Sequence, residues 1–228
     1  MQMLTKLCHK NVIKLNEIID AEKSKYVYLV MNLCQGGTLL EKLDKSDSGL
    51  DEALVKQYFR STLSAIHYCL EVHNISHRDI KPENIMLDHE GEVFLCDFGC
   101  SEFFQPQEED LSKATKGTYL FMAPEMFKTG AEKIVKGRAV DIWALGVTLF
   151  NLLTKDHPWK GSGPMDLANK IKFEPPALDK LGEGRDQLKE LLGRILEKDP
   201  EKRIDIYQLI DDPWVTDDGQ NVIDLDLS

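Results

Sequence analysis

The feature that most constrains this chain is a polar segment near its middle, together with a short motif downstream. The segment is His77-Arg78-Asp79-Ile80-Lys81-Pro82-Glu83-Asn84, and Asp97-Phe98-Gly99 begins thirteen residues after its asparagine. A phosphoryl transfer needs a carboxylate near the attacking hydroxyl, a cation near the phosphate and oxygen ligands for Mg²⁺. Asp79 offers the carboxylate, Lys81 the cation, and Asn84 with Asp97 the hard oxygen donors that Mg²⁺ prefers. For this chemistry the fold has to bring both motifs to one place.

Length and composition are those of an ordinary soluble globular protein. The 228 residues exceed one average domain and fall short of two, with 42% hydrophobic and 29% charged residues. The net charge of −11 argues against nucleic acid or an anionic membrane as the main partner, because both attract a basic surface. It suits a basic peptide, although acidic proteins are common and this indication is weak.

The cysteines and the apolar runs favour a cytoplasmic protein. The five cysteines are an odd number without zinc-finger spacing, which indicates reduced thiols. Cys96 and Cys100 flank Asp97-Phe98-Gly99. Either one of them is a reactive thiol or, as is commoner, both are small buried hydrophobes. No signal-peptide pattern is visible, and the most apolar stretch, 140–153, is too short to span a bilayer.

The first part of the chain reads as strands followed by one long helix. Residues 1–7 have helical spacing, whereas 12–19 and 26–33 are rich in β-branched and aromatic residues and predict a hairpin. Gln35-Gly36-Gly37 breaks the second strand and reads as a linker. From Asp51, a potential cap, apolar residues at steps of four and three predict a helix as far as Leu70.

The polar segment is expected as a loop beside short strands, and the rest of the chain as helices. Strands are expected at 85–87 and 93–96 around a turn at Glu90-Gly91. After Gly130 only helices are predicted, at 138–154, 165–173, 187–197 and 204–210, the first of them buried. Residues 217–228 are polar and acidic, which predicts a frayed tail. Strands first and helices afterwards indicate an α+β arrangement.

The two motifs, in this order and at this spacing, resemble the catalytic loop and the metal-binding triplet of eukaryotic protein kinases. The resemblance covers nearly all of residues 1–216 and implies an α+β, protein-kinase-like bilobal fold with a truncated N-terminal lobe. Residues 1–33 would be the remnant of that lobe, with the end of one helix and two strands. Residues 34–216 would be the hinge and a complete, mainly helical C-terminal lobe, and 217–228 an acidic tail.

The resemblance implies ATP-dependent phosphorylation of serine or threonine in proteins, with ATP and Mg²⁺ as cofactors. Asp79 would accept the hydroxyl proton, the alternative being a solvated loop aspartate, and Lys81 would offset charge on the transferred phosphoryl. A lysine at this place is similar to serine/threonine kinases rather than tyrosine kinases. Asn84 and Asp97 would bind Mg²⁺. Thr118, in a segment 117–125 that resembles the family's substrate-binding strip, would hydrogen-bond near Asp79 and Lys81.

Other matching residues are implied to support this site. Glu125, at the end of the strip, would form a buried ion pair with Arg203; the alternative is an exposed arginine. Asp141 lies in the most apolar predicted helix and would accept backbone N–H groups of the catalytic loop, because a buried carboxylate needs donors. His77 and Phe98, with Leu4 as a third member, have the family's hydrophobic-spine positions.

The nucleotide-binding residues are implied by register alone. Met31, Asn32, Leu33 and Cys34 would form the hinge whose backbone groups meet the adenine, with Met31 controlling access to the pocket behind it. Met86 would lie against the adenine ring. For the methionines the plainer alternative is core packing, which is the commoner role of a methionine on a strand.

Flanking motifs look most like the calcium/calmodulin-dependent protein kinase kinases. They are 121–125, 146–149, 212–215 and the long interval between Glu125 and Asp141. Those enzymes phosphorylate activation loops of other kinases, so the implied partner is a protein with a serine or threonine acceptor, with another kinase as one option. The acidic tail is not a basic amphipathic helix, so no calmodulin target is visible.

The departure from the family lies before His9, where its Gly-rich phosphate loop, strand lysine and helix glutamate are expected and are not found. Two hypotheses follow. The first is a serine/threonine kinase whose start is missing from this sequence. The second is a short, catalytically weak or inactive kinase-like module that binds kinase substrates. The intact Asp79, Lys81, Asn84 and Asp97 favour the first.

Ser112 and Thr115 lie where activation-loop phosphosites occur in the family. Arg78 is the natural cation to receive a phosphate there. The acidic run Glu108-Glu109-Asp110 lies in the same loop and could occupy Arg78 without modification. Thr115→Ala is therefore expected to change activity only modestly.

Overall fold

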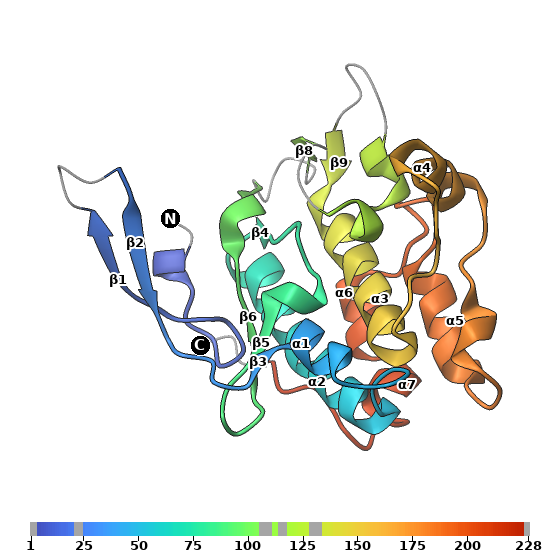
Figure 1. Cartoon of the computed structure of the whole chain (residues 1–228), viewed down its shortest axis with the longest axis horizontal. Coiled ribbons are helices and arrows are strands. Elements are labelled where there is room, and N and C mark those ends of the chain that lie inside the picture. The colour runs from blue at the N-terminus through green and yellow to red at the C-terminus, as the bar shows by residue number, and fades with distance from the viewer. Residues whose placement is uncertain (1–3, 21–24, 105–110, 114–117, 128–133, 226–228) are drawn as a thin grey trace.

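An antiparallel hairpin stands to one side of a larger, mainly helical body (Figure 1). This computed structural model describes residues 4–20, 25–104, 111–113, 118–127 and 134–225. The hairpin consists of β1 (Leu15–Asp20) and β2 (Val27–Met31), with Leu15 opposite Met31 and Asp20 opposite Val27. The predicted pair of strands is confirmed. Every residue of β2 and all but the first of β1 are exposed.

The first strand begins three residues later than the sequence pattern predicted. Val12 and Ile13 are buried against the helical body instead: the Ile13 N–H donates to the Leu95 carbonyl at 3.0 Å, and Val12 forms a parallel bridge to Leu95. The apolar side chains of Val12 and Ile13 made the predicted strand too long, because the backbone of these two residues pairs with Leu95 and not with β2. The described part of the expected N-terminal helix is a short 3₁₀ turn, Leu4–Lys6.

A small antiparallel sheet adjoins the polar segment, because its strand β5 (Ile85–Leu87) begins directly after Asn84. Its order is β3 (Gly37–Thr38), β5 and β6 (Val93–Leu95), so the two expected short strands are confirmed. The predicted linker at Gly36-Gly37 is part of this sheet, because the Gly36 N–H donates to the Leu87 carbonyl at 2.8 Å. A Cβ on Gly36 would lie only 2.5 Å from the Asp88 carbonyl oxygen, so the close approach requires glycine.

Two capped helices lie between β3 and β5 in the chain. α1 (Leu39–Asp44) begins with a capping box, in which the Thr38 hydroxyl accepts from the Glu41 N–H at 3.1 Å. The sequence did not predict this helix, because six residues show fewer than two turns of periodicity. α2 (Glu52–His67) is capped by Asp51 as expected and continues as a π-helical turn, Tyr68–Val72.

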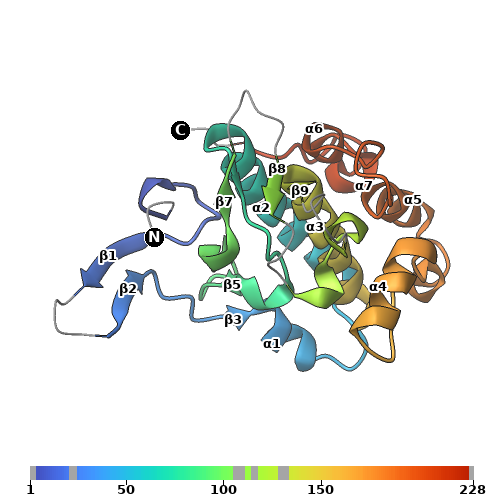
Figure 2. The ribbon, with the colours of Figure 1, turned by 90° about the horizontal axis from the view of Figure 1, so that it is seen from above.

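The helix α3 (Gly137–Thr154) is the centre of the core, as its apolar sequence predicted. Trp143 and Phe150 are completely buried on it, and it packs against α2 and α5. Gly146 permits the contact with α5, since a Cβ there would lie 2.2 Å from the Ile195 side chain. The other three predicted helices are confirmed as α4 (Pro164–Phe173), α5 (Asp186–Ile195) and α6 (Ile206–Ile210), of which α4 and α5 lie on the side of α3 away from the hairpin (Figure 2). The short helix α7 (Pro213–Thr216) was not predicted.

Two short ladders lie outside the predicted pattern. β9 (Ile134–Lys136) pairs antiparallel with β8 (Leu111–Lys113), so the expectation of helices alone after Gly130 is wrong. β4 (Ile75–Ser76) pairs antiparallel with β7 (Glu102–Phe103). Strands of two or three residues are too short to show alternation, and their partners are distant in sequence.

The acidic tail is docked rather than frayed over its described part. Ile223 is buried, and the Asp217 carboxylate pairs with Lys56 and Arg60 of α2. The Asp224 carbonyl accepts from the Ser64 hydroxyl of α2 at 3.1 Å. The prediction of fraying is therefore wrong for 217–225, because an apolar residue and opposite charges on α2 outweigh the polar composition.

Among the described residues, no helix combines the length and the apolarity needed to cross a membrane. The five cysteines form no disulfides. Burial raises the pKa of Cys96 to about 12, which favours the buried hydrophobe over the reactive thiol at this position.

Candidate active site

The polar segment is a loop between β4 and β5, and a buried aspartate of α3 holds its beginning. The Asp141 carboxylate accepts from the backbone N–H groups of His77 and Arg78, each at 2.7 Å, and from the Ser76 hydroxyl at 3.0 Å. These donors satisfy a carboxylate that is completely buried. The predicted contact between Asp141 and the loop is confirmed.

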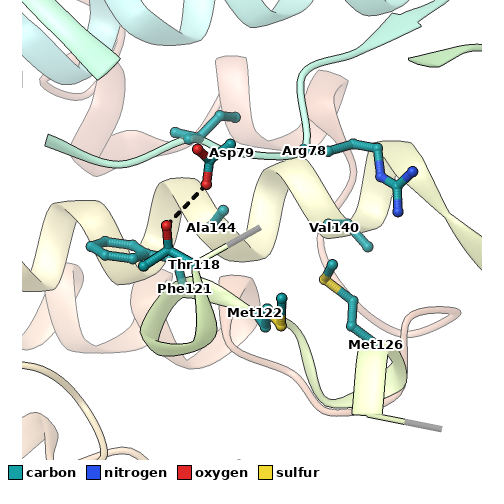
Figure 3. Close-up of a pocket in the computed structure, with 9 residues that line it drawn as sticks. Arg78, Asp79, Thr118, Phe121, Met122, Met126, Val140 and Ala144 are labelled. Carbon is teal, nitrogen blue, oxygen red and sulfur yellow. Dashed lines mark hydrogen bonds between the residues drawn. The ribbon is translucent and has the colours of Figure 1, made fainter. Parts of the chain in front are cut away.

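Four of the predicted site residues meet at the Asp79 carboxylate. Lys81 Nζ lies 2.8 Å from Asp79 Oδ2, and Asn84 Nδ2 donates to the same oxygen at 3.1 Å. The Thr118 hydroxyl donates to Asp79 Oδ1 at 3.1 Å (Figure 3) and accepts from Lys81 Nζ at 2.8 Å. The fold thus brings the loop and the strip to one carboxylate, although Asp79 and Thr118 are 39 residues apart.

This environment keeps Asp79 ionised. Burial alone would raise the pKa of Asp79, but the hydrogen bond and charge of Lys81, with hydrogen bonds from Thr118 and Asn84, lower that pKa below its ordinary value. An ionised carboxylate can orient a hydroxyl group by accepting its hydrogen bond and can accept its proton during a transfer.

Asn84 and Asp97 present oxygen atoms of the kind that Mg²⁺ binds. Asn84 Nδ2 also donates to the Asp79 carbonyl at 2.7 Å, so its Oδ1 is the atom left to act as a ligand. Asp97 is exposed, and its Oδ1 accepts from the Gly99 N–H at 3.1 Å. Within the described ranges, no cluster of three or more His, Cys, Asp or Glu side chains could hold a metal ion. The pair fits an ion that takes few ligands from protein and the others from phosphate and water.

His77 joins the loop to the turn at Asp97. Its Nε2 lies 2.9 Å from the Cys96 carbonyl, and its ring packs edge-on against Phe98 with centroids 4.8 Å apart. Burial lowers the pKa of His77, which favours the neutral ring, and Nε2 carries the hydrogen because the carbonyl oxygen can only accept the hydrogen bond. Leu4, which with His77 and Phe98 was expected at the hydrophobic-spine positions, is also buried.

The end of the strip is fastened to the helices by a buried ion pair. Arg203 Nη1 and Nη2 lie 2.7 and 3.0 Å from the two carboxylate oxygens of Glu125, and neither side chain is more than 4% exposed. The guanidinium also donates to the Ala139 carbonyl at 2.7 Å and lies over the Trp143 ring. The predicted pair is confirmed, and the alternative of an exposed Arg203 is excluded.

A narrow pocket opens beside Asp79 (Figure 3). In that view Thr118 points toward the Asp79 carboxylate and Arg78 points away from it. Most of the lining is apolar and comes from the strip and α3. The lining residues are Arg78, Asp79, Ile80, Thr118, Phe121, Met122, Met126, Val140 and Ala144.

The expected hinge residues are the last residue of β2 and the first residues of the connection to β3. Met31 is the last residue of β2, the Asn32 N–H donates to the Lys14 carbonyl at 3.2 Å, and Leu33 is 77% exposed. Cys34 is buried, which raises the pKa of its thiol. Met86 is half-buried on β5. None of these residues lines the pocket beside Asp79, and their contact with adenine stays a prediction.

Nearly the whole chain matches a known family. A family model described as protein kinase domain matches residues 1–215. The chain belongs to the protein kinase family. The expected α+β kinase fold is thereby confirmed, and the geometry around Asp79 lies in a kinase domain.

Curated relatives support the serine/threonine branch of the family. The chain is 38% identical over 217 residues to a calcium/calmodulin-dependent protein kinase kinase of Caenorhabditis elegans, covering 95% of this chain and 39% of that protein. It is 35% identical over 226 residues to the serine/threonine-protein kinase ppk34 of Schizosaccharomyces pombe, covering 97% and 61%. It is 34% identical over 211 residues to a human SNF-related serine/threonine-protein kinase, covering 91% and 26%. This kinase domain therefore spans less than two thirds of each of these relatives.

Three side chains beside the catalytic loop were not singled out from the sequence. The Ser76 hydroxyl contacts Asp141, the Ser101 hydroxyl donates to the His77 carbonyl at 3.2 Å, and Glu102 pairs with Arg78 at 2.7 Å. Ser101 and Glu102 lie within five residues of Asp97, but nothing in their local sequence distinguishes them from surface residues.

Arg78 has a different described partner from the one considered from the sequence. Its Nη1 pairs with Glu102 of β7. The acidic run Glu108-Glu109-Asp110 and Thr115 lie outside the described residues, so their relation to Arg78 is untested. Ser112 lies in β8, opposite Val135 of β9.

Proposed function

We propose that this kinase domain transfers the γ-phosphoryl group of ATP to serine or threonine hydroxyls of protein substrates. The observation that carries the proposal is the convergence of Lys81, Asn84 and Thr118 on the Asp79 carboxylate. A solvated loop aspartate would not need donors from two separate segments.

The side chains around Asp79 have distinct roles in this proposal. The Asp79 carboxylate accepts the hydrogen bond of the acceptor hydroxyl and then its proton, a role that typically contributes about 10²–10⁴-fold to a rate. Lys81 Nζ lies between Asp79 and Thr118 and supplies positive charge where the phosphoryl group is transferred. The Thr118 hydroxyl hydrogen-bonds both Lys81 and Asp79 and so helps to hold these two side chains together.

The nucleotide and the metal ion would lie toward Asp97. Asn84 and Asp97 would hold Mg²⁺, which when bound neutralises charge on the phosphates. Asn84 also donates to Asp79, so the same side chain orients the base and would bind the metal ion. The backbone of Met31, Asn32, Leu33 and Cys34 would receive the adenine, with Met86 against the ring.

The substrates proposed for this domain are proteins with a serine or threonine acceptor, including activation loops of other kinases. The support is its likeness to the Caenorhabditis elegans protein that is named a kinase kinase. The charge of −11 is compatible with a basic segment around the acceptor. We place this activity in the cytoplasm on the pattern of the cysteines.

A second candidate is a kinase-like module that binds kinase substrates with little or no transfer. The observation that favours it is the hairpin, in which every residue of β2 is exposed. A two-stranded hairpin is by itself a poor cover for a nucleotide. If this second candidate is right, Asp79 and the side chains that converge on it would contribute to substrate binding and not to phosphoryl transfer.

Transfer from γ-labelled ATP to serine, threonine and tyrosine peptides separates the two candidates. The kinase proposal predicts Mg²⁺-dependent labelling of serine or threonine peptides that is lost in Asp79→Asn and retained in the exposed control Asp179→Asn. Fusing a Gly-rich lobe from a related kinase should raise that rate strongly, because positioning of the phosphates is most of this catalysis. Peptide binding without transfer in both forms would support the binding module and refute the kinase proposal.

A further inference from the structure

Residues 101–104, which follow Asp97, contact residues 74–77, which precede Asp79, and these contacts form a junction between the two segments. The Phe104 N–H donates to the Asn74 carbonyl at 2.9 Å, and Phe103 lies opposite Ile75 in the ladder of β4 and β7. The Ser101 hydroxyl reaches the His77 carbonyl. A ladder of two residue pairs is weak by itself, so other contacts must hold this junction.

A largely buried ion pair between Arg78 and Glu102 also joins these two segments. Ser76 lies opposite Glu102, which brings Glu102 to the loop, and Arg78 Nη1 lies 2.7 Å from Glu102 Oε1. The Arg78 side chain is 0% exposed, while that of Glu102 is 30% exposed. A guanidinium stays protonated at all accessible pH values, so a buried one requires a nearby carboxylate.

The backbone of Arg78 also depends on its surroundings. Its φ is 68°, in the left-handed region that a residue with a long side chain rarely adopts. Such a conformation persists where neighbouring contacts fix it. Asp141 fixes the Arg78 N–H, and Glu102 fixes the other end of the residue, its guanidinium.

The geometry points to Glu102 as a positioning residue that, through Arg78, sets the Asp79 carboxylate relative to Asp97. Arg78 adjoins Asp79 in the chain, and Glu102 follows the Asp97 turn. His77 contacts the Cys96 carbonyl before that turn, and Arg78 contacts Glu102 after it. The turn that carries Asp97 is thus attached to the catalytic loop at both ends. The kinetic part of this inference rests on the proposed transfer function, whereas its structural part does not.

Hydrogen exchange of the purified chain tests the structural part. Glu102→Gln removes the charge at nearly constant size, and Glu92→Gln, in the exposed turn between β5 and β6, is the matched control. In Glu102→Gln, amides of 74–79 and 100–104 should exchange at least about tenfold faster, whereas Glu92→Gln should leave them unchanged. Exchange at the wild-type rate in Glu102→Gln would overturn the inference, whatever the activity of the chain.

Kinetics test the positioning role. Glu102→Gln should lower kcat by about ten- to a hundredfold, with KM for ATP within about twofold, because misplacement of the base acts on the chemical step. Glu102→Asp should recover part of kcat, because it restores the charge. Faster exchange with unchanged kcat would make Glu102 a structural residue alone and overturn the positioning role. Should wild type show no transfer, the proposed function fails, and the exchange result still decides the structural part.

If Glu102→Gln does not fold, a double variant keeps the inference testable. Arg78→Met with Glu102→Met removes the buried cation together with its partner, and such apolar replacements of buried pairs are often tolerated. The double variant should fold and show the same faster exchange of 100–104. Exchange of 100–104 at the wild-type rate in the folded double variant would show that the pair does not hold this junction.

Discussion

Replacing Arg203 with methionine should strongly destabilise the fold by leaving Glu125 buried without its partner. The two oxygens of Glu125 lie 2.7 and 3.0 Å from the guanidinium, and the Glu125 side chain is 4% exposed. Removing one partner of a buried pair typically costs about 3–5 kcal/mol. That is a large share of a total stability of about 5–15 kcal/mol. For a domain of this size, each kcal/mol of lost stability lowers Tm by about 2–4 °C. A loss of about 3–5 kcal/mol should therefore lower Tm by roughly 6–20 °C.

The control for this prediction is the adjacent lysine. Lys202 lies 3.6 Å from Asp199, and these side chains are 76% and 42% exposed. An exposed pair contributes about 0–1 kcal/mol, so Lys202→Met should leave Tm nearly unchanged. Urea denaturation should show a lower midpoint with an unchanged slope in Arg203→Met, since the surface exposed on unfolding stays the same.

A double variant decides whether the stranded charge is the cause. Glu125→Met with Arg203→Met should recover part of the stability, because no charge is then left buried. A loss below about 1 kcal/mol in Arg203→Met would refute the reasoning, since that is the range of exposed pairs.

Three further changes test separate parts of the account. Asp97→Asn should abolish most of the Mg²⁺-dependent affinity for an ATP analogue, because it removes the charged metal ligand at constant size; equal affinity by calorimetry would count against the metal site. Lys81→Met should raise the pKa of Asp79, since Lys81 is the main group that lowers it, and should move the acid limb of the transfer rate to higher pH; an unmoved limb would contradict this. Ile223→Ala should cost about 2–5 kcal/mol in urea denaturation, whereas a frayed tail would lose almost nothing.

Elements with a long periodic pattern were predictable from the sequence. The helix α3 was recognisable from its apolar residues, and α2 from its spacing and its Asp51 cap. The hairpin was recognisable from its β-branched and aromatic strands. What the pattern could not reveal was the pairing of Ile75 with Phe103 and the docking of Ile223, because both depend on partners that are distant in sequence.

The sequence predicted the residues of the candidate site better than the residues that hold the catalytic loop in place. Asp79 and Lys81 belong to one short motif, whereas Thr118 and Arg203 were placed by likeness to a family and not by any local pattern. Glu102 was overlooked because a glutamate after Asp97 looks like any surface residue until the register of β4 and β7 sets it against Arg78. Tertiary contacts of this kind decide which of several acidic residues faces a buried cation.

The measurement that tests the central claim most directly compares Asp79→Asn with wild type at saturating Mg²⁺ and ATP, in the form fused to a Gly-rich lobe. Nucleotide affinity is measured by calorimetry on the same samples, so that binding and transfer are separated. The account predicts affinity within about twofold of wild type and transfer to a serine or threonine peptide reduced by about 10²–10⁴-fold. Transfer at the wild-type rate in Asp79→Asn would contradict the account, because the carboxylate on which Lys81, Asn84 and Thr118 converge would then not be the base.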